Sequence, residues 1–183
     1  MGEGAERGIQ LRKDLEQEPF EFVSKLVRHL VSKGTTHIRG HIDIDHDIKL
    51  KRVEAILKVR DKYKDYVDIQ LVAFPQSGLV KSPGTKELII EAINDMGVDI
   101  IGGIDPQTFD NDRKGNLDQL FEIFEKTNGA PLDPPIHDSG PIGPEPLQEI
   151  IRRAKTYVHG IKGTLNNPPG FALNSMSHDE LIS

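Results

Sequence analysis

The chain has 183 residues, which is enough for one domain with a hydrophobic core. Its net charge of -6 argues against a nucleic-acid partner, and no apolar run approaches the ~20 residues needed to cross a bilayer. Cysteine is absent, which excludes disulfides, thiolate nucleophiles and cysteine-based zinc sites. The segment 1–16 is charged and lacks the apolar part of a secretory signal, so we expect a cytoplasmic protein without a membrane partner.

The first helix is predicted over residues 23–31. Its apolar residues recur with helical spacing, and Gly34 follows at a position where helices commonly end. The segment 35–44 then alternates with a period of two, which is typical of a strand. One face of this strand carries Ile38, Ile42 and Ile44, and the other carries His37, Arg39, His41 and Asp43.

Helices and strands continue to alternate through the rest of the chain. A helix over 82–96 is predicted to begin with Ser82 as its cap and Pro83 at its first position. The remaining predicted helices cover 50–57, 116–127 and 144–158, and the remaining predicted strands cover 67–75, 99–105, 132–137 and 163–167.

This order predicts an α/β fold built from parallel βα repeats. An open doubly wound sheet and a segment of a (β/α)8 barrel both fit. Polar residues on one face of several strands favour the barrel, because strands of a doubly wound sheet are apolar on both faces. A full barrel needs about 250 residues and eight units. We therefore predict a partial (β/α) TIM barrel of about five strands over 22–167, between a charged N-terminal segment 1–21 and an irregular tail 168–183.

Gln76 is the first candidate site residue. It follows the strand at 67–75 on the side where barrel enzymes place their chemistry, and its carboxamide can both donate and accept hydrogen bonds. The competing interpretation is a turn residue that caps a loop.

Histidines and carboxylates form two further candidates. His37 and His41 are about 13 Å apart on a strand and cannot share one metal ion, while His41 and Asp43 would need further ligands. We favour a solvated acidic turn over 43–47 that leads into a helix. His137 and Asp138 end the strand at 132–137 and have the chemistry for proton transfer, but such a pair is common, and from these residues alone we favour a surface loop.

Two of these strands resemble sequence motifs of the cytosine deaminases and related amidohydrolases. The segment 34–44, GTTHIRGHIDI, resembles the family strand GTT.xRxHVDxD, and the segment 68–78, DIQLVAFPQSG, resembles DIQxVAFPQxG. Three shorter matches follow in the family's order, at 84–85, 102–106 and 137–138. The resemblance covers about residues 22–176.

The resemblance implies a hydrolase that uses Zn or Fe to activate water for attack on a ring carbon bearing an amine. The family chemistry is deamination of a cyclic amidine or pyrimidine-type ring. Gln76 matches the glutamine that holds the ring, and His41 and His137 lie in matching motifs, so we expect these three residues to contact a small-molecule ring substrate. Asp138 stands where the family has its proton-transferring carboxylate.

The metal ligands of the family are not matched. No His-x-His is present, Pro135 stands at one expected ligand position and Pro169 at another, and the final aspartate ligand would lie beyond Ser183. Proline has no side-chain donor for a metal. We therefore expect no cofactor in this chain.

Three hypotheses follow from this pattern. We favour an amidohydrolase-like protein that is inactive as this chain. The second is an active deaminase whose missing strands come from a complementing chain. The third is a non-catalytic binding or assembly module, in which exposed sheet edges support a homo-oligomer.

Overall fold

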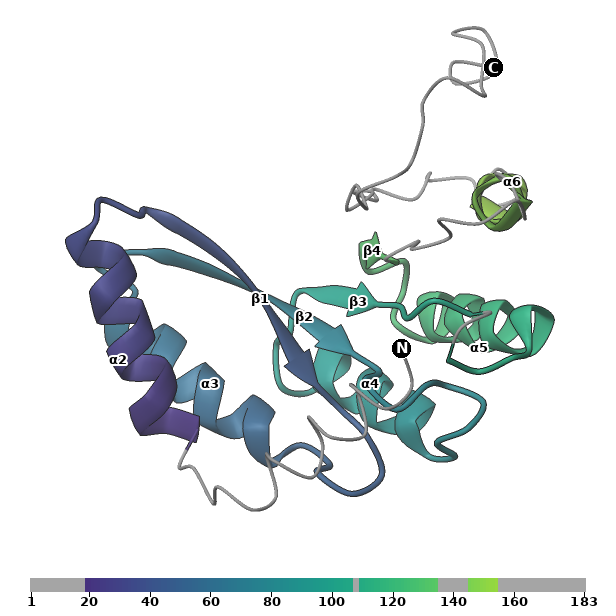
Figure 1. Ribbon diagram of the computed structural model, residues 1–183, viewed down its shortest axis with the longest axis horizontal. Coiled ribbons are helices and arrows are strands. Elements are labelled where there is room, and N and C mark those ends of the chain that lie inside the picture. The colour runs from purple at the N-terminus through teal and green to yellow at the C-terminus, as the bar shows by residue number, and fades with distance from the viewer. Residues whose placement is uncertain (1–18, 107–108, 135–144, 155–183) are drawn as a thin grey trace, which may run out of the picture.

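A computed structural model of the chain describes residues 19–106, 109–134 and 145–154 (Figure 1). Helices and strands alternate along these residues. In chain order they are α2 (Pro19–Ser32), β1 (His37–Asp43), α3 (Lys51–Tyr63), β2 (Asp68–Phe74), α4 (Thr85–Asn94), β3 (Ile100–Gly102), α5 (Arg113–Lys126), β4 (Leu132–Asp133) and α6 (Glu145–Ala154).

The four strands form one parallel sheet in the order β1-β2-β3-β4. The pairing of β1 with β2 is the longest and runs from His37 opposite Asp68 to Asp43 opposite Phe74. β3 and β4 are short, and Gly102 lies opposite Asp133 in the last pair. The predicted α/β fold of parallel βα repeats is confirmed.

One face of the sheet packs against the helices. The alternation predicted for β1 is confirmed there, because Ile42 and Ile44 are fully buried. They join core residues of the next strand and helix, including Leu71 and Val53. Apolar side chains at every second strand position therefore bury the sheet against α2, α3 and α4, which lie together on one side of β1 and β2 in Figure 1.

The other face of the sheet is concave, and on it polar side chains of β1, β2 and β4 lie beside the buried apolar residues Val72 and Ile100. On a flat sheet β1 and β4 would be separated by three strand spacings, about 14 Å. Yet the Arg39 Nη1 atom lies 3.3 Å, and the His41 Nε2 atom 3.8 Å, from Oδ2 of Asp133 on β4. Side chains that stand upright on a flat sheet would not meet across the intervening strands, so these contacts indicate that the sheet curls toward this face. The curvature is that of a barrel segment rather than of an open sheet.

Several predicted boundaries were wrong. α4 begins at Thr85 rather than Pro83, after Gly84 with a φ of 92°. Ser82 does not cap the helix, because its hydroxyl accepts a hydrogen bond from the Thr85 side chain within the preceding turn. β3 is shorter than the strand predicted over 99–105. The predicted strand over 163–167, the end of that over 132–137 and the end of the last helix lie outside the described residues.

Candidate functional site

The concave face of the sheet carries a cluster of charged and polar side chains from three strands. Arg39 on β1 donates from Nε to Oε1 of Gln70 on β2 at 2.7 Å, and from Nη1 to Oδ2 of Asp133 on β4 at 3.3 Å. The Asp133 side chain is fully buried, whereas those of Arg39 and His41 are each 34% exposed. A buried carboxylate needs such a partner, since an uncompensated charge is costly away from water.

His41 lies between this carboxylate and an aromatic ring. Its imidazole makes an edge-to-face contact with Phe74 on β2, with ring centroids 5.7 Å apart and planes at 85°. Asp43 contacts a helix residue instead, because its Oδ2 accepts a hydrogen bond from Arg52 Nη1 on α3 at 2.7 Å. His41 and Asp43, the two residues whose ligand chemistry the sequence analysis considered together, therefore contact different partners, Asp133 and Arg52.

The acidic turn predicted over 43–47 is held by Asp45, which is buried rather than solvated. Its Oδ1 accepts hydrogen bonds from the backbone N–H groups of Asp47 and Ile48 at 3.0 and 2.8 Å. Its Oδ2 accepts one from the Ser77 hydroxyl at 2.9 Å. Asp45 thus fastens the loop after β1 to the loop after β2, while His46 and Asp47 are exposed as expected.

Gln76 lies in the loop that follows β2, at the carboxyl end of the parallel strands, and is half-buried. Its backbone N–H donates to the carbonyl of Phe74 at 2.9 Å, so the chain turns directly after the strand. The neighbouring Ser77 is held by Asp45. Side chains at this end of a parallel barrel face the mouth, where barrel enzymes bind their substrates.

Asp110 braces the same loop from the other side. This buried carboxylate accepts hydrogen bonds from the backbone N–H groups of Leu79 and Lys81, each at 3.0 Å, and from Asn116 Nδ2 at 2.7 Å. A side chain at Gly78 would overlap Asp110, so the glycine allows the loop to approach. The position of Gln76 therefore depends on two buried aspartates.

The site residues predicted from the sequence are only partly described. The structure places His41 within the concave cluster and Gln76 at the carboxyl end of the next strand, while His137 and Asp138 lie outside the described residues. Sequence reasoning missed the contacts of Arg39 with Gln70 and Asp133. The sequence identified the polar face of each strand. Arg39 lies opposite Gln70 in the parallel register, but the sequence of either strand alone does not determine that register.

A metal ion does not fit the residues of this cluster. Within residues 19–106, 109–134 and 145–154, no group of three or more His, Asp or Glu side chains is arranged to hold one. His41 and Asp133 are two potential ligands, but the guanidinium of Arg39 already contacts the same carboxylate oxygen. A positive charge therefore lies beside this pair of potential ligands, and we derive no metal-dependent step from them.

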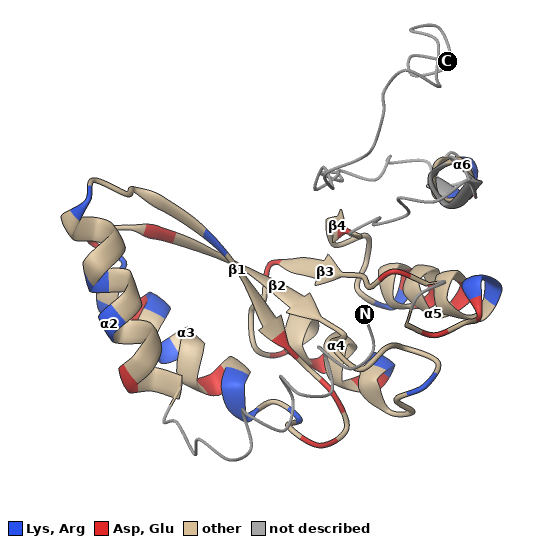
Figure 2. Ribbon diagram, in the orientation of Figure 1, with Lys and Arg blue, Asp and Glu red and all other residues tan. Residues whose placement is uncertain are grey.

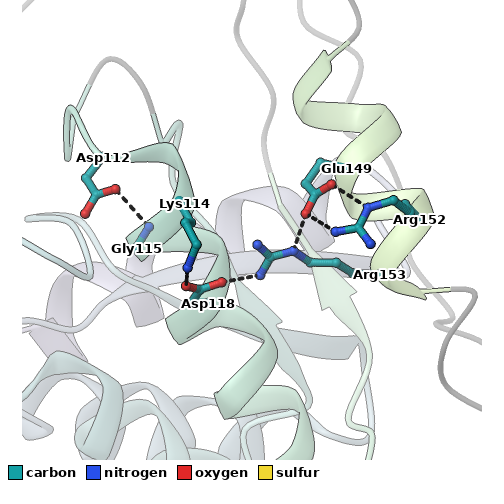
Figure 3. Close-up of polar contacts among 7 residues, drawn as sticks. All are labelled: Asp112, Lys114, Gly115, Asp118, Glu149, Arg152 and Arg153. Atoms are coloured by element: carbon teal, nitrogen blue, oxygen red, sulfur yellow. Dashed lines mark hydrogen bonds and ion pairs between the residues drawn. The ribbon is translucent and has the colours of Figure 1, made fainter.

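A second polar network lies between the outer helices α5 and α6 (Figure 3). Asp118 accepts from Lys114 at 2.6 Å and pairs with Arg153 at 2.7 Å, and Glu149 accepts from Arg152 and Arg153. Hydrogen bonds from Arg152 first, and then from Arg153, lower the pKa of Glu149 to about 2. Acids and bases alternate along α3 (Figure 2). The groove of about 510 Å³ between α5 and α6 differs, because its lining holds one acid, Glu149, and four basic side chains, Arg113, Lys114, Arg152 and Arg153.

Comparison with known proteins gives consistent matches to one group of enzymes. No protein-family model matches the chain. It is 36% identical over 161 residues to the N-isopropylammelide isopropyl amidohydrolase of Pseudomonas sp. strain ADP, covering 86% of this chain and 38% of that protein.

Solved structures show the same likeness. The N-isopropylammelide isopropylaminohydrolase of Burkholderia multivorans is 38% identical with a TM-score of 0.68, covering 73% of this chain and 34% of that one. The 5-methylcytosine deaminase of Klebsiella pneumoniae, liganded with phosphonocytosine, is 29% identical with a TM-score of 0.69, covering 85% of this chain and 38% of that one.

The chain thus spans between 34% and 38% of the length of these three relatives. None of its described helices is both long and apolar enough to cross a membrane, and the cytoplasmic location stays a prediction. The relatives are (β/α) barrel enzymes, in agreement with the curled parallel sheet. The chain is therefore a homologue of the cytosine deaminase-like amidohydrolases over the part of their length that it spans.

Proposed function

We propose that this chain carries the ring-binding part of an amidohydrolase and does not hydrolyse the ring by itself. The family chemistry is metal-dependent hydrolytic deamination of a cyclic amidine or pyrimidine-type ring. The similarity to a 5-methylcytosine deaminase and to two hydrolases of N-isopropylammelide supports a planar nitrogen heterocycle as the ligand. The observation that carries the proposal is the position of Gln76 at the carboxyl end of β2, within the motif that matches the family.

The chemistry of Gln76 suits such a ring. A carboxamide presents one acceptor and two donors in a plane, which complements a ring edge with adjacent carbonyl and N–H groups. The loop is held on both sides by the buried carboxylates of Asp45 and Asp110, so little conformational entropy is lost when the ring binds. His41 and Phe74 offer aromatic surface on the adjoining strands.

Hydrolysis is a separate requirement that this chain does not meet. A metal-bound hydroxide needs several side-chain ligands, and the changes to Pro135 and Pro169 remove two that the family pattern expects. Replacing even a group that only supports a ligand costs ~10–100-fold in metal affinity or activity, so losing ligands outright is more severe. We therefore expect ring binding without turnover.

Fluorine NMR tests the binding directly. The probe is 5-fluorocytosine, with which the Klebsiella deaminase has also been crystallised. The wild-type chain should broaden or shift the single ¹⁹F resonance in a saturable manner. Gln76→Ala should weaken binding by at least about tenfold, which corresponds to ~1.4 kcal/mol.

The matched control is Gln148→Ala, which removes the same carboxamide from an exposed position on α6. This variant should bind like the wild type. The proposal is refuted if 5-fluorocytosine does not bind the wild-type chain, or if Gln76→Ala and Gln148→Ala bind it equally well.

A further inference from the structure

We infer that the groove between α5 and α6 binds the phosphate group of a small phosphate ester. The groove has a volume of about 510 Å³, within the range of ~300–1,000 Å³ that is typical of small-molecule sites. Its walls come from two consecutive βα units, β3 with α5 and β4 with α6. Gln76 does not line this groove, so the inference is independent of the proposed ring binding.

Positive charge exceeds negative charge around this groove. The charged side chains that line it are one acid, Glu149, and four bases, Arg113, Lys114, Arg152 and Arg153. Asp118, which contacts two of these bases, brings the number of acids to two. Four positive and two negative charges leave an excess of two positive charges among these residues. The whole chain carries a net charge of -6, so this positive excess is a local feature.

The basic side chains of the groove share their acidic partners (Figure 3). Asp118 contacts Lys114 at 2.6 Å and Arg153 at 2.7 Å. Glu149 accepts hydrogen bonds from Arg152 and Arg153, each at 2.7 Å. Hydrogen bonds from Lys114 first, and then from Arg153, also hold the pKa of Asp118 below its ordinary value. Three cations thus share two carboxylates, and both carboxylates already lie in a positive field.

Two of these cations can turn toward a ligand at little cost. The side chains of Lys114 and Arg152 are 82% and 68% exposed, and exposed ion pairs contribute little to stability. Arg153 differs, because its side chain is only 18% exposed and its guanidinium lies 5.6 Å from the centroid of the Phe121 ring. Arg153 therefore joins the two helices, while Lys114 and Arg152 supply the movable positive charge.

The start of α5 departs from the usual charge preference of helices. Acidic residues stabilise the first turn of a helix, because the N-terminal end of its dipole is positive. Asp112 caps α5, but the helix then begins with Arg113 and Lys114 and has no acid in its first turn. These two cations repel the positive end of the dipole, and an anion in the groove would offset that repulsion. Departures from a local rule of this kind are expected at functional sites.

A phosphate ester matches the groove in charge and in geometry. Guanidinium groups such as that of Arg152 bind phosphate oxygens through two parallel hydrogen bonds. A phosphate monoester carries a charge of about -1.5 to -2 at neutral pH, close to the local excess of two positive charges, whereas a carboxylate carries only one negative charge. Leu117 and the aliphatic stems of the arginines also line the groove, which favours an ester with an organic part over inorganic phosphate.

Phosphorus NMR on the full chain tests this inference at low ionic strength, with glycerol 1-phosphate and inorganic phosphate as the probes. The chain should shift the ³¹P resonance of glycerol 1-phosphate in a saturable manner, and it should bind this ester more tightly than inorganic phosphate. The double variant Lys114→Gln, Arg152→Gln should raise the dissociation constant of the ester by at least about tenfold. The control Lys51→Gln, Lys58→Gln removes two positive charges from exposed positions on α3 and should bind like the wild type.

Circular dichroism checks that each variant is folded, and the single variant Lys114→Gln, which removes one fully solvated charge, should show an intermediate loss of binding. Succinate, which carries two carboxylates, serves as a competitor of similar charge and should displace the ester only weakly. Four results would overturn the inference. They are no saturable shift with the wild type, equal binding by the two double variants, inorganic phosphate that binds as tightly as the ester, and succinate that binds as tightly as the ester.

Discussion

Replacing Asp110 with alanine tests how the loop that carries Gln76 is held in place. The Asp110 carboxylate accepts three hydrogen bonds, from two backbone N–H groups of the loop after β2 and from Asn116 on α5. Hydrogen bonds to a charged group contribute ~1.5–3 kcal/mol each, and the contributions are not additive. A single substitution rarely costs more than ~4–5 kcal/mol. We expect Asp110→Ala to lower the free energy of unfolding by about 3–4 kcal/mol.

Urea unfolding followed by circular dichroism measures this change, and the chain has no tryptophan to follow by fluorescence. With a slope of about 2 kcal/mol per molar urea, the midpoint should fall by roughly 1.5–2 M. The control is Asp112→Ala. Asp112 is exposed, and its side chain accepts a hydrogen bond from the backbone N–H of Gly115 at the start of α5. Loss of such a helix cap costs about 1 kcal/mol.

Asp110→Ala should also weaken the binding of 5-fluorocytosine, because the loop would lose the geometry that presents Gln76. Asp112→Ala should leave that binding unchanged. If Asp110→Ala unfolds at the wild-type midpoint and binds the ring normally, Asp110 does not brace the loop and the account of the site is wrong.

Two further predictions concern the sheet and the outer helices. Gly102→Ala should cost about 2–3 kcal/mol in a urea melt, since a Cβ atom at Gly102 would meet the Ala73 carbonyl and lie 3.1 Å from the Phe74 Cα; a change below about 0.5 kcal/mol would contradict the packing described. The pKa of Glu149 in the folded chain, about 2, lies below its ordinary value of 4.5. Its stabilising effect on α6 should therefore be complete above about pH 4.5 and decline as the pH falls toward 2, and amide exchange in α6 should show this decline in the wild type but not in Glu149→Gln.

The β1 strand shows how much of the fold was predictable from the sequence. Alternation with a period of two identified Ile42 and Ile44 as core residues, because a strand places successive side chains on opposite faces. The same rule assigned Arg39 and His41 to the polar face. Local patterns of this kind determined the order of helices and strands, the parallel sheet and the choice of a barrel segment.

Tertiary contacts explain what the sequence did not reveal. Ser82 and Pro83 form a favourable helix start locally, but the Ser82 hydroxyl is engaged with Thr85 in the preceding turn, and α4 begins after Gly84. The contact between Arg39 and Asp133 spans 94 positions of the chain and depends on the curvature of the whole sheet. Such a contact follows from how the strands assemble, and no local pattern encodes it.

The central claim is that this chain retains the ring-binding residue of its relatives and lacks their means of hydrolysis. The most direct measurement is the ¹⁹F spectrum of 5-fluorocytosine incubated with the purified chain and added Zn²⁺ or Fe²⁺. We predict that the 5-fluorocytosine resonance persists and that no 5-fluorouracil resonance grows. Conversion to 5-fluorouracil that stops when a chelator is added would contradict the account.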